Sequence, residues 1–170
     1  VRSSGFGPST GKGASLIFQE SPVSMENVVV QEVSERDVVN VIRGSCALVR
    51  CSITGGRDQL TLNYVDARID GLGLADAADD ALTIRGGKST MKGLVATGAK
   101  GIGLKASIQA DVRFDASKIW SSKKGMEVEG ASHVTINGGS VQSDGIGIEV
   151  RDAEMRTGPS IVELKGVTIE

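Results

Sequence analysis

Apolar and polar residues alternate in a short phrase that recurs along the chain. The phrase is a charged residue, a small or polar residue, and then two apolar residues separated by one position, as in Asp80-Ala-Leu82-Thr-Ile84. The steps between successive copies are 21, 22, 20, 24 and 20 residues, and the copies begin at Asp37, Asp58, Asp80, Lys100, Lys124 and Asp144. An uneven period near 20 that returns to an alternating strand indicates a solenoid, in which successive coils stack on one another.

Each repeat also carries a second apolar cluster. In one repeat Val112 and Phe114 are followed by Ile119, and the next repeat keeps the same offsets of two and seven. Residues two apart lie on the same side of a strand, and turn residues such as Asn137-Gly-Gly139 separate the clusters. The pattern predicts an all-β fold, a single-stranded right-handed parallel β-helix of six to seven coils with 20–24 residues per coil and three short strands in each.

Two other repeat architectures fit the pattern less well. Repeats of paired helices are usually about 33 residues or longer, and frequent glycines would cost each helix about 1 kcal/mol per glycine. Leucine-rich repeats share the period, but their asparagine and leucine spacing is absent.

The alignment of the phrases predicts which side chains become neighbours in adjacent coils. We expect the first apolar residues of four copies to form one internal file, namely Leu82, Ile102, Met126 and Ile146. The charged residues that open the phrases should stack as well, with Asp80 over Lys100 and Lys124 beneath Asp144. Such exposed pairs contribute about 0 to 1 kcal/mol each.

The regular repeat predicts two segments of the chain. Residues 1–25 fit it poorly and are expected to form an irregular segment, a partial coil or a cap, whereas residues 26–170 form the β-helix. The glycine-rich stretch around Lys12 lacks the spacing of a phosphate-binding loop. Because the sequence starts at Val1 and stops within a strand-like segment, we expect a processed product or an excised piece whose last coil is followed by more chain or covered by another chain.

Composition narrows the classes of partner. The 19 basic and 21 acidic residues give a net charge of -2, so nucleic acid is not an expected partner. No apolar segment reaches the roughly 18 to 20 residues that would span a membrane.

Cys46 and Cys51 are predicted to be small buried residues, with a disulfide across a turn as the alternative. With His133 as the one histidine, a zinc site is not expected, and His133 is interpreted as a turn or surface residue.

Several phrases resemble those of known β-helix proteins. The segments are Arg57 to Leu62, Asp79 to Gly87 and Gly98 to Leu104. They resemble the β-helix regions of bacterial surface and secreted proteins, within the pectate-lyase-like superfamily. The resemblance implies an extracellular or cell-envelope protein in which this region presents a surface for polysaccharide or protein contact.

A second resemblance concerns chemistry. Ile69-Asp70-Gly71 and Ala78-Asp79-Asp80-Ala81 resemble the first two acidic phrases of pectin-hydrolysing enzymes of the polygalacturonase type. The resemblance implies Asp70, Asp79 and Asp80 as catalytic carboxylates. The later phrases of that family, G-H-G and R-I-K, are absent, because Lys100-Gly-Ile102-Gly and Lys124-Gly-Met126 stand in their places.

A lyase or epimerase would need a base beside a uronic carboxylate and a cation to neutralise that carboxylate. Asp79 and Asp80 would be the acid or base, and Lys100 the charge partner. No cofactor is expected, although calcium between Asp58 and Asp80 stays an open alternative. The competing interpretation is that aspartates at strand starts are turn residues that bond nearby amides.

Tyr64 and Trp120 are the candidates for stacking on a sugar ring. The leading hypothesis is a noncatalytic β-helix module that binds polysaccharide or protein. The alternatives are a polysaccharide lyase, epimerase or glycoside hydrolase acting on uronic-acid polymers, and a self-associating fibre or tailspike segment.

Overall fold

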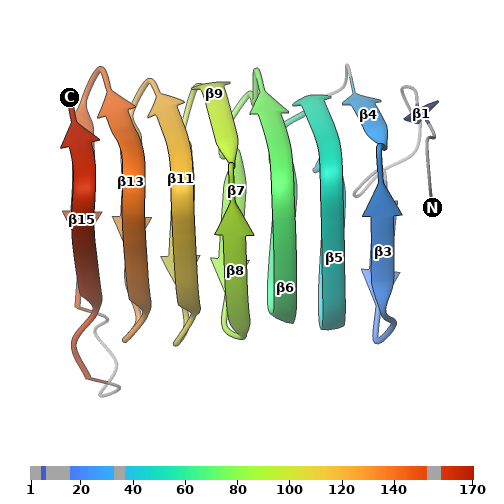
Figure 1. Cartoon of the computed structure of the whole chain (residues 1–170), viewed down its shortest axis with the longest axis horizontal. Helices are drawn as coiled ribbons and strands as arrows, with labels where there is room; N and C mark the ends of the chain where they lie inside the picture. The colour runs from blue at the N-terminus through green and yellow to red at the C-terminus, as the bar shows by residue number, and fades with distance from the viewer. Residues whose placement is uncertain (1–4, 7–15, 33–36, 153–157) are drawn as a thin grey trace.

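The computed structural model describes residues 5–6, 16–32, 37–152 and 158–170. It is all-β, a parallel β-solenoid of about six turns, as the sequence predicted. The coils lie side by side along the long axis of the molecule, with the C-terminus at the last coil (Figure 1). The described residues of the segment 1–25 already include strands that pair with the next coil. The glycine-rich stretch around Lys12 lies outside the described residues.

Fifteen strands are formed by the described residues, and every pairing between them is parallel. They are β1 (Gly5–Phe6), β2 (Leu16–Gln19), β3 (Val23–Glu26), β4 (Val29–Glu32), β5 (Val39–Gly55), β6 (Leu60–Ala75), β7 (Leu82–Arg85), β8 (Lys88–Lys92), β9 (Val95–Ala99), β10 (Ile102–Ser107), β11 (Asp111–Ser121), β12 (Lys124–Val128), β13 (His133–Ser143), β14 (Ile146–Val150) and β15 (Ile161–Ile169).

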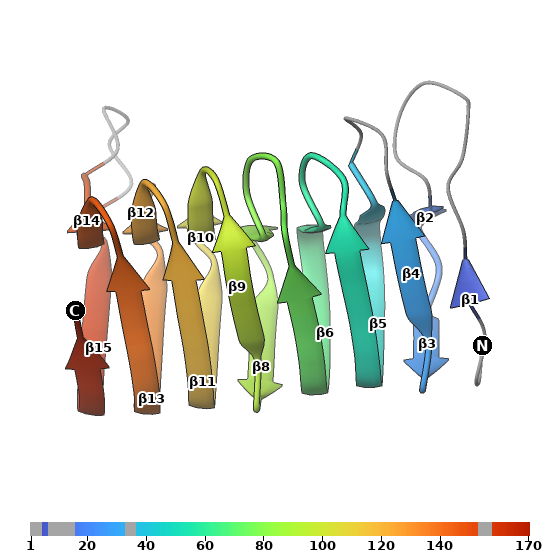
Figure 2. The same cartoon turned by 90° about the horizontal axis from the view of Figure 1, so that it is seen from above.

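Each coil has three faces, which strand β6 defines because it runs round a whole coil. Its residues 60–63 pair with β7, residues 67–70 with β8 and residues 73–75 with β9. We call these the first, second and third faces. Figure 2 shows β10, β12 and β14 along the first face, with β11, β13 and β15 continuing round the coil. Each coil thus has the three strand segments predicted from the apolar clusters, but they are separate short strands in β2–β4 and β7–β9 and continuous in β5 and β6.

The corner between the second and third faces is made by one residue of left-handed backbone conformation in each coil. Equivalent positions in successive coils all have positive φ, namely Asn27, Arg50, Gly71, Gly93, Ala116, Gly138 and Gly166. Glycine takes up this conformation without strain, and asparagine tolerates it better than most residues. Because one residue turns the chain at the same place in each coil, the strands on either side stay in register.

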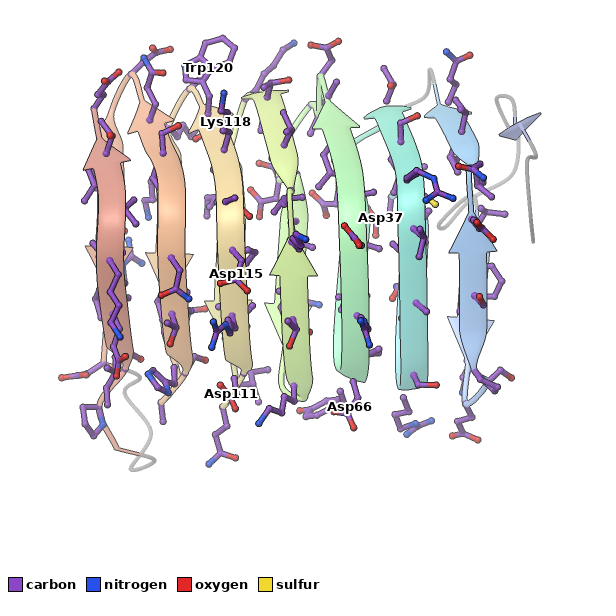
Figure 3. All side chains as sticks on the ribbon, viewed as in Figure 1. Asp37, Asp66, Asp111, Asp115, Lys118 and Trp120 are labelled. Carbon is purple, nitrogen blue, oxygen red and sulfur yellow. The ribbon has the colours of Figure 1, made fainter. Side chains whose placement is uncertain are left out.

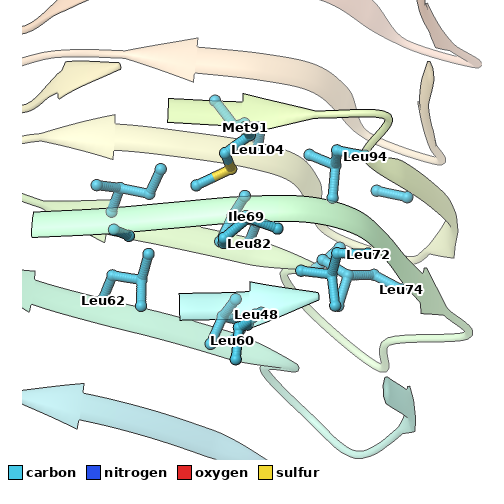
Figure 4. Packing of buried hydrophobic residues seen from close by; sticks show 14 of the residues in the cluster. Leu48, Leu60, Leu62, Ile69, Leu72, Leu74, Leu82, Met91, Leu94 and Leu104 are labelled. Atoms are coloured by element: carbon cyan, nitrogen blue, oxygen red, sulfur yellow. The ribbon is translucent and has the colours of Figure 1, made fainter. Parts of the chain in front are cut away.

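The core is a set of apolar files that run through the coils. Leu60, Leu82, Leu104 and Met126 are fully buried at equivalent positions. Figure 4 shows the first three among the buried side chains. Burying a side chain of this size contributes roughly 1.5 to 3 kcal/mol. Stacked files of this kind give a core without any helix or second sheet.

The structure corrects the predicted register. Leu82 pairs with Leu104 rather than Ile102, and Met126 pairs with Ile148 rather than Ile146. Ile102 is half-buried and Ile146 is 46% exposed, so neither belongs to the internal file. The step along this file is 22 residues. The error arose because a charged residue was taken as the start of each phrase, although in two copies the charge lies two residues before the equivalent position.

The predicted charge stacking is wrong for the same reason. The residue that stacks on Asp80 is Ile102, whose amide donates to the Asp80 carboxylate. Lys124 is paired with Ile146 rather than Asp144. Lys124 forms its ion pairs with Glu127 and Glu149 instead.

Both cysteines are free and buried, which confirms their interpretation as small core residues. Burial, with a smaller effect of the neighbouring Cys51, raises the pKa of the Cys46 thiol to about 12. The thiol therefore stays protonated at neutral pH. Within the described ranges, no helix has the length and apolar character needed to cross a membrane.

Candidate functional site

Of the predicted catalytic aspartates, Asp79 and Asp80 lie at the corner that leads from the third face to the first, beside Asp58 of the preceding coil. Asp58 accepts a hydrogen bond from the Asp80 amide at 3.2 Å, and Asp80 accepts one from the Ile102 amide at 2.8 Å. Each carboxylate thus caps the next coil. As in the competing interpretation the aspartates bond backbone amides, but each donor lies 22 residues ahead in the next coil and not in a local turn.

At this corner the aspartate carboxyls are partly buried, and a nearby arginine balances part of their negative charge. Burial raises the pKa of the Asp58 and Asp80 carboxyls, and the amide hydrogen bonds oppose that shift. Arg57 lies 2.7 Å from Asp37 and 3.7 Å from Asp58, counting from guanidinium nitrogen to carboxylate oxygen. The corner is therefore a partly neutralised acidic ladder. Among the described residues, no three acidic, histidine or cysteine side chains are arranged to hold a metal ion.

The other predicted catalytic residues are placed apart from this ladder. Asp79 is exposed at the same corner, with its amide bonded to the Arg57 carbonyl. Asp70 lies on the second face, paired with Lys92. Lys100 is exposed and forms no ion pair within the described part of the chain, whereas Lys105 is the cation that acts on the Asp80 carboxyl. The structure therefore brings Asp79 and Asp80 together and leaves Asp70 on another side of the coil.

Trp120 lies on the third face, where its ring projects from strand β11 beyond Lys118 (Figure 3). The Trp120 side chain is 39% exposed. It borders a shallow depression of about 270 Å³ that is also lined by Thr97, Ser140 and Gln142. An aromatic ring therefore lies beside hydroxyl and amide groups that donate and accept hydrogen bonds.

The third face differs from the other two because its outward side chains are mostly uncharged. Two columns of positions run along it, comprising Val29, Ser52, Gly73, Val95, Lys118, Ser140, Thr168, and Gln31, Thr54, Ala75, Thr97 and, past a register shift between β9 and β11, Trp120, Gln142, Glu170. Lys118 and Glu170 are the charged members of these two columns. The surface is a low-charge strip of small, hydroxyl and amide side chains beside one large ring.

Comparisons of the chain with protein-family models, with curated proteins and with solved structures find no match.

Tyr64, the second predicted stacking residue, lies at the corner between the first and second faces. It has positive φ and is 56% exposed. Its ring covers Gly86 of the next coil, where a Cβ atom would come within 2.6 Å of ring carbon Cδ1. Since Trp120 lies on the third face, the structure does not bring the two aromatic side chains together.

A cluster of charges on the first face was not predicted. Glu127 is 3% exposed and pairs with Lys105 at 2.8 Å and with Lys124. Glu149 pairs with Lys124 and with Arg151, the latter at 2.8 Å. Lys105, Glu127 and Glu149 recur at intervals of 22 residues in the sequence, but the coil register is needed to show that they stack.

The cations of this cluster lower the pKa of its two glutamates. Although burial opposes ionisation, hydrogen bonds from Lys105 and Lys124 hold the pKa of Glu127 below its usual range. Hydrogen bonds from Arg151 and Lys124 lower the pKa of Glu149 to about 2. An acid with a lowered folded-state pKa contributes stability above its unfolded pKa and loses it as the pH falls.

We therefore expect the unfolding free energy to decrease as the pH falls from about 5 towards 2, since unfolded glutamate titrates near 4.3. At pH 7, Glu127→Gln should lower the unfolding free energy by about 2 kcal/mol, because a hydrogen bond to a charged group is lost. At pH 3 the difference from wild type should shrink. Urea unfolding at both pH values measures this, with exposed Glu163→Gln as the control. An equal difference at both pH values would contradict the assignment.

Proposed function

We propose that this chain is a noncatalytic β-solenoid module of an extracellular or cell-envelope protein, and that its third face binds a linear polysaccharide. The supporting observation is the exposed Trp120 ring beside a depression on a low-charge face. A tryptophan ring offers a rigid apolar surface with a polar N–H at its edge. The C–H faces of a sugar ring would stack on it.

The neighbouring groups would supply the polar contacts. Thr97 and Ser140 carry hydroxyls, and Gln142 carries an amide with both donor and acceptor atoms. Sugar hydroxyls need such groups, and fixed strands hold them in place. The third face continues the same low-charge character over neighbouring coils, so a polymer lying along the solenoid axis would stay in contact beyond the Trp120 depression.

The chain has one tryptophan, so its intrinsic fluorescence reports on this depression alone. Titration with a panel of neutral and acidic polysaccharides should change the Trp120 emission for the polymer that binds. Trp120→Phe should keep part of the affinity measured by calorimetry, and Trp120→Ala should lower it about tenfold, because an aromatic contact contributes about 0.5 to 1.5 kcal/mol.

Tyr64→Ala is the matched control, since it removes an exposed aromatic side chain from a different corner. It should leave the affinity within about twofold of wild type. Equal losses for Tyr64→Ala and Trp120→Ala, or no change in emission with any polymer of the panel, would contradict the proposal.

A polysaccharide-modifying enzyme is the second candidate, and the raised pKa of Asp58 and Asp80 favours it. A carboxyl with a raised pKa is better suited to act as a general acid than an ordinary aspartate. Against it, each of these carboxylates already accepts a backbone amide of the next coil. The same polymer panel, assayed for reducing ends and for absorbance of unsaturated product, separates the two functions. Turnover that Asp80→Asn abolishes would replace the binding proposal.

A further inference from the structure

The outward side chains of the second face form a lattice of alternating charge across three coils. Strands β6, β8 and β11 each contribute one row of three residues. The rows are Asp66, Arg68, Asp70, then Lys88, Thr90, Lys92, then Asp111, Arg113, Asp115. The residues are in direct register, and Asp66, Asp111 and Asp115 are visible in Figure 3. We call this array the charge lattice.

Thr90 is at the centre of the charge lattice. Arg68 and Arg113 are its partners in the coils on either side, and Lys88 and Lys92 lie two residues away along its own strand. These four cations are its nearest neighbours, at backbone spacings of about 4.8 Å between coils and about 6.7 Å along the strand. The four aspartates occupy the diagonal positions, about 8 Å away by the same spacings. By these backbone spacings the positions nearest to Thr90 carry cations and the more distant ones carry anions, although the whole array is neutral.

Two of the four cations are already paired. Lys88 lies 3.4 Å from the Asp111 carboxylate, and Arg113 lies 3.3 Å from Asp115. Arg68 and Lys92, in contrast, form no ion pair within the described residues. Lys92 helps to lower the pKa of Asp115 but is not ion-paired with it. Among the described residues, Arg68 and Lys92 are therefore the lattice cations without an ion pair, and Asp66 and Asp70 are the lattice anions without one.

The surface is hollowed on both sides of these residues. One depression of about 420 Å³ and another of about 290 Å³ both have Arg68 and Thr90 in their lining. The first is also bordered by Lys88 and Asp66, and the second by Lys92, Asp70 and Asp115. The small side chains of the preceding coil, such as Ala47, leave room for a ligand beside Arg68.

We propose that the charge lattice is a binding site for the oxyanion groups of a polymer, with one sulfate or carboxylate seated over Thr90. The Thr90 hydroxyl and the Lys92 ammonium would each donate one hydrogen bond, and the Arg68 guanidinium matches the paired oxygens of such a group. The site is exposed, so its affinity falls as salt is added. It lies on a different face from Trp120 and does not depend on the function proposed for that residue.

Three polymers with one backbone test the site, namely dextran, carboxymethyl-dextran and dextran sulfate. Affinity is measured by biolayer interferometry at low and at physiological salt. We expect the two anionic polymers to bind in a salt-sensitive way, and their ranking to identify the preferred group. Thr90→Asp, which places a carboxylate at the centre of the lattice, should lower affinity for both at least tenfold. Lys92→Gln should lower it about threefold.

Two controls make the test specific. Lys165→Gln removes a cation from the same face outside the lattice, and Trp120→Ala alters the third face. Both should leave binding of dextran sulfate within twofold of wild type, and circular dichroism checks that every variant is folded. Binding by folded Thr90→Asp within twofold of wild type would overturn the proposal, as would an equal loss for Lys165→Gln. Loss of neutral polymer binding in Trp120→Ala concerns the third face alone.

Discussion

Replacing Gly139 by alanine is expected to lower the unfolding free energy by about 4 kcal/mol, from left-handed strain plus a steric clash. Gly139 has φ of 97°, in the range that favours glycine. A Cβ atom built there would lie 1.8 Å from the Ser117 carbonyl oxygen and 2.8 Å from the Ser117 nitrogen. These are backbone atoms of the neighbouring coil, so no side-chain rotation relieves the overlap.

Gly138→Ala is the matched control at the adjacent position. Gly138 also has positive φ, at 69°, but a Cβ there meets no atom within 4 Å. Its equivalent in the preceding coil is Ala116, which has φ of 51°. Alanine is therefore compatible with this corner, and Gly138→Ala should cost about 1 kcal/mol. Equilibrium urea unfolding of both variants measures the difference.

The comparison isolates the contact between coils from the conformational preference of glycine. Both substitutions place alanine in left-handed backbone, but only Gly139→Ala drives a side chain into the coil beside it. Similar losses for the two variants would show that Ser117 and Gly139 are not in close contact. That result would contradict the coil stacking at this corner.

The fold was predictable because it depends on local alternation. Val112, Phe114 and Ile119 were placed on inward positions of one coil by their spacing alone, and all three are buried. A strand pattern survives an error in the alignment of coils, since residues two apart keep the same side. The alignment of the coils depends on the number of residues in each coil, and no short pattern in the sequence gives that number.

In the candidate sites, too, local features could be predicted from the sequence, whereas contacts between coils could not. Amide bonding by Asp58 and Asp80 was one of the interpretations, but it was expected within a local turn, whereas the donating amides belong to the next coil. The charge lattice was missed, since its four central cations come from three coils. The row Asp-x-Arg-x-Asp occurs twice in the sequence, at positions 66–70 and 111–115, and it becomes informative once the coils are in register.

Substitution of Leu104 by alanine tests that register, with an expected loss of about 3 kcal/mol in unfolding free energy. Leu104 is fully buried between Leu82 and Met126 of the neighbouring coils. Truncation would remove apolar contacts and leave a cavity, because the stacked strands on either side restrict any collapse into the space.

Ile102→Ala provides the contrast, since the phrase in the sequence would place Ile102 rather than Leu104 in the internal file. Ile102 is half-buried at the corner and stacks on Asp80 and Lys124, so its truncation should cost about 1 kcal/mol. Thermal and urea unfolding of the two variants measure the two losses in unfolding free energy. A larger loss for Ile102→Ala than for Leu104→Ala would require a step of 20 residues between these coils. The alignment of Arg68, Thr90 and Arg113 rests on the same pairing between coils, so it would then have to be revised.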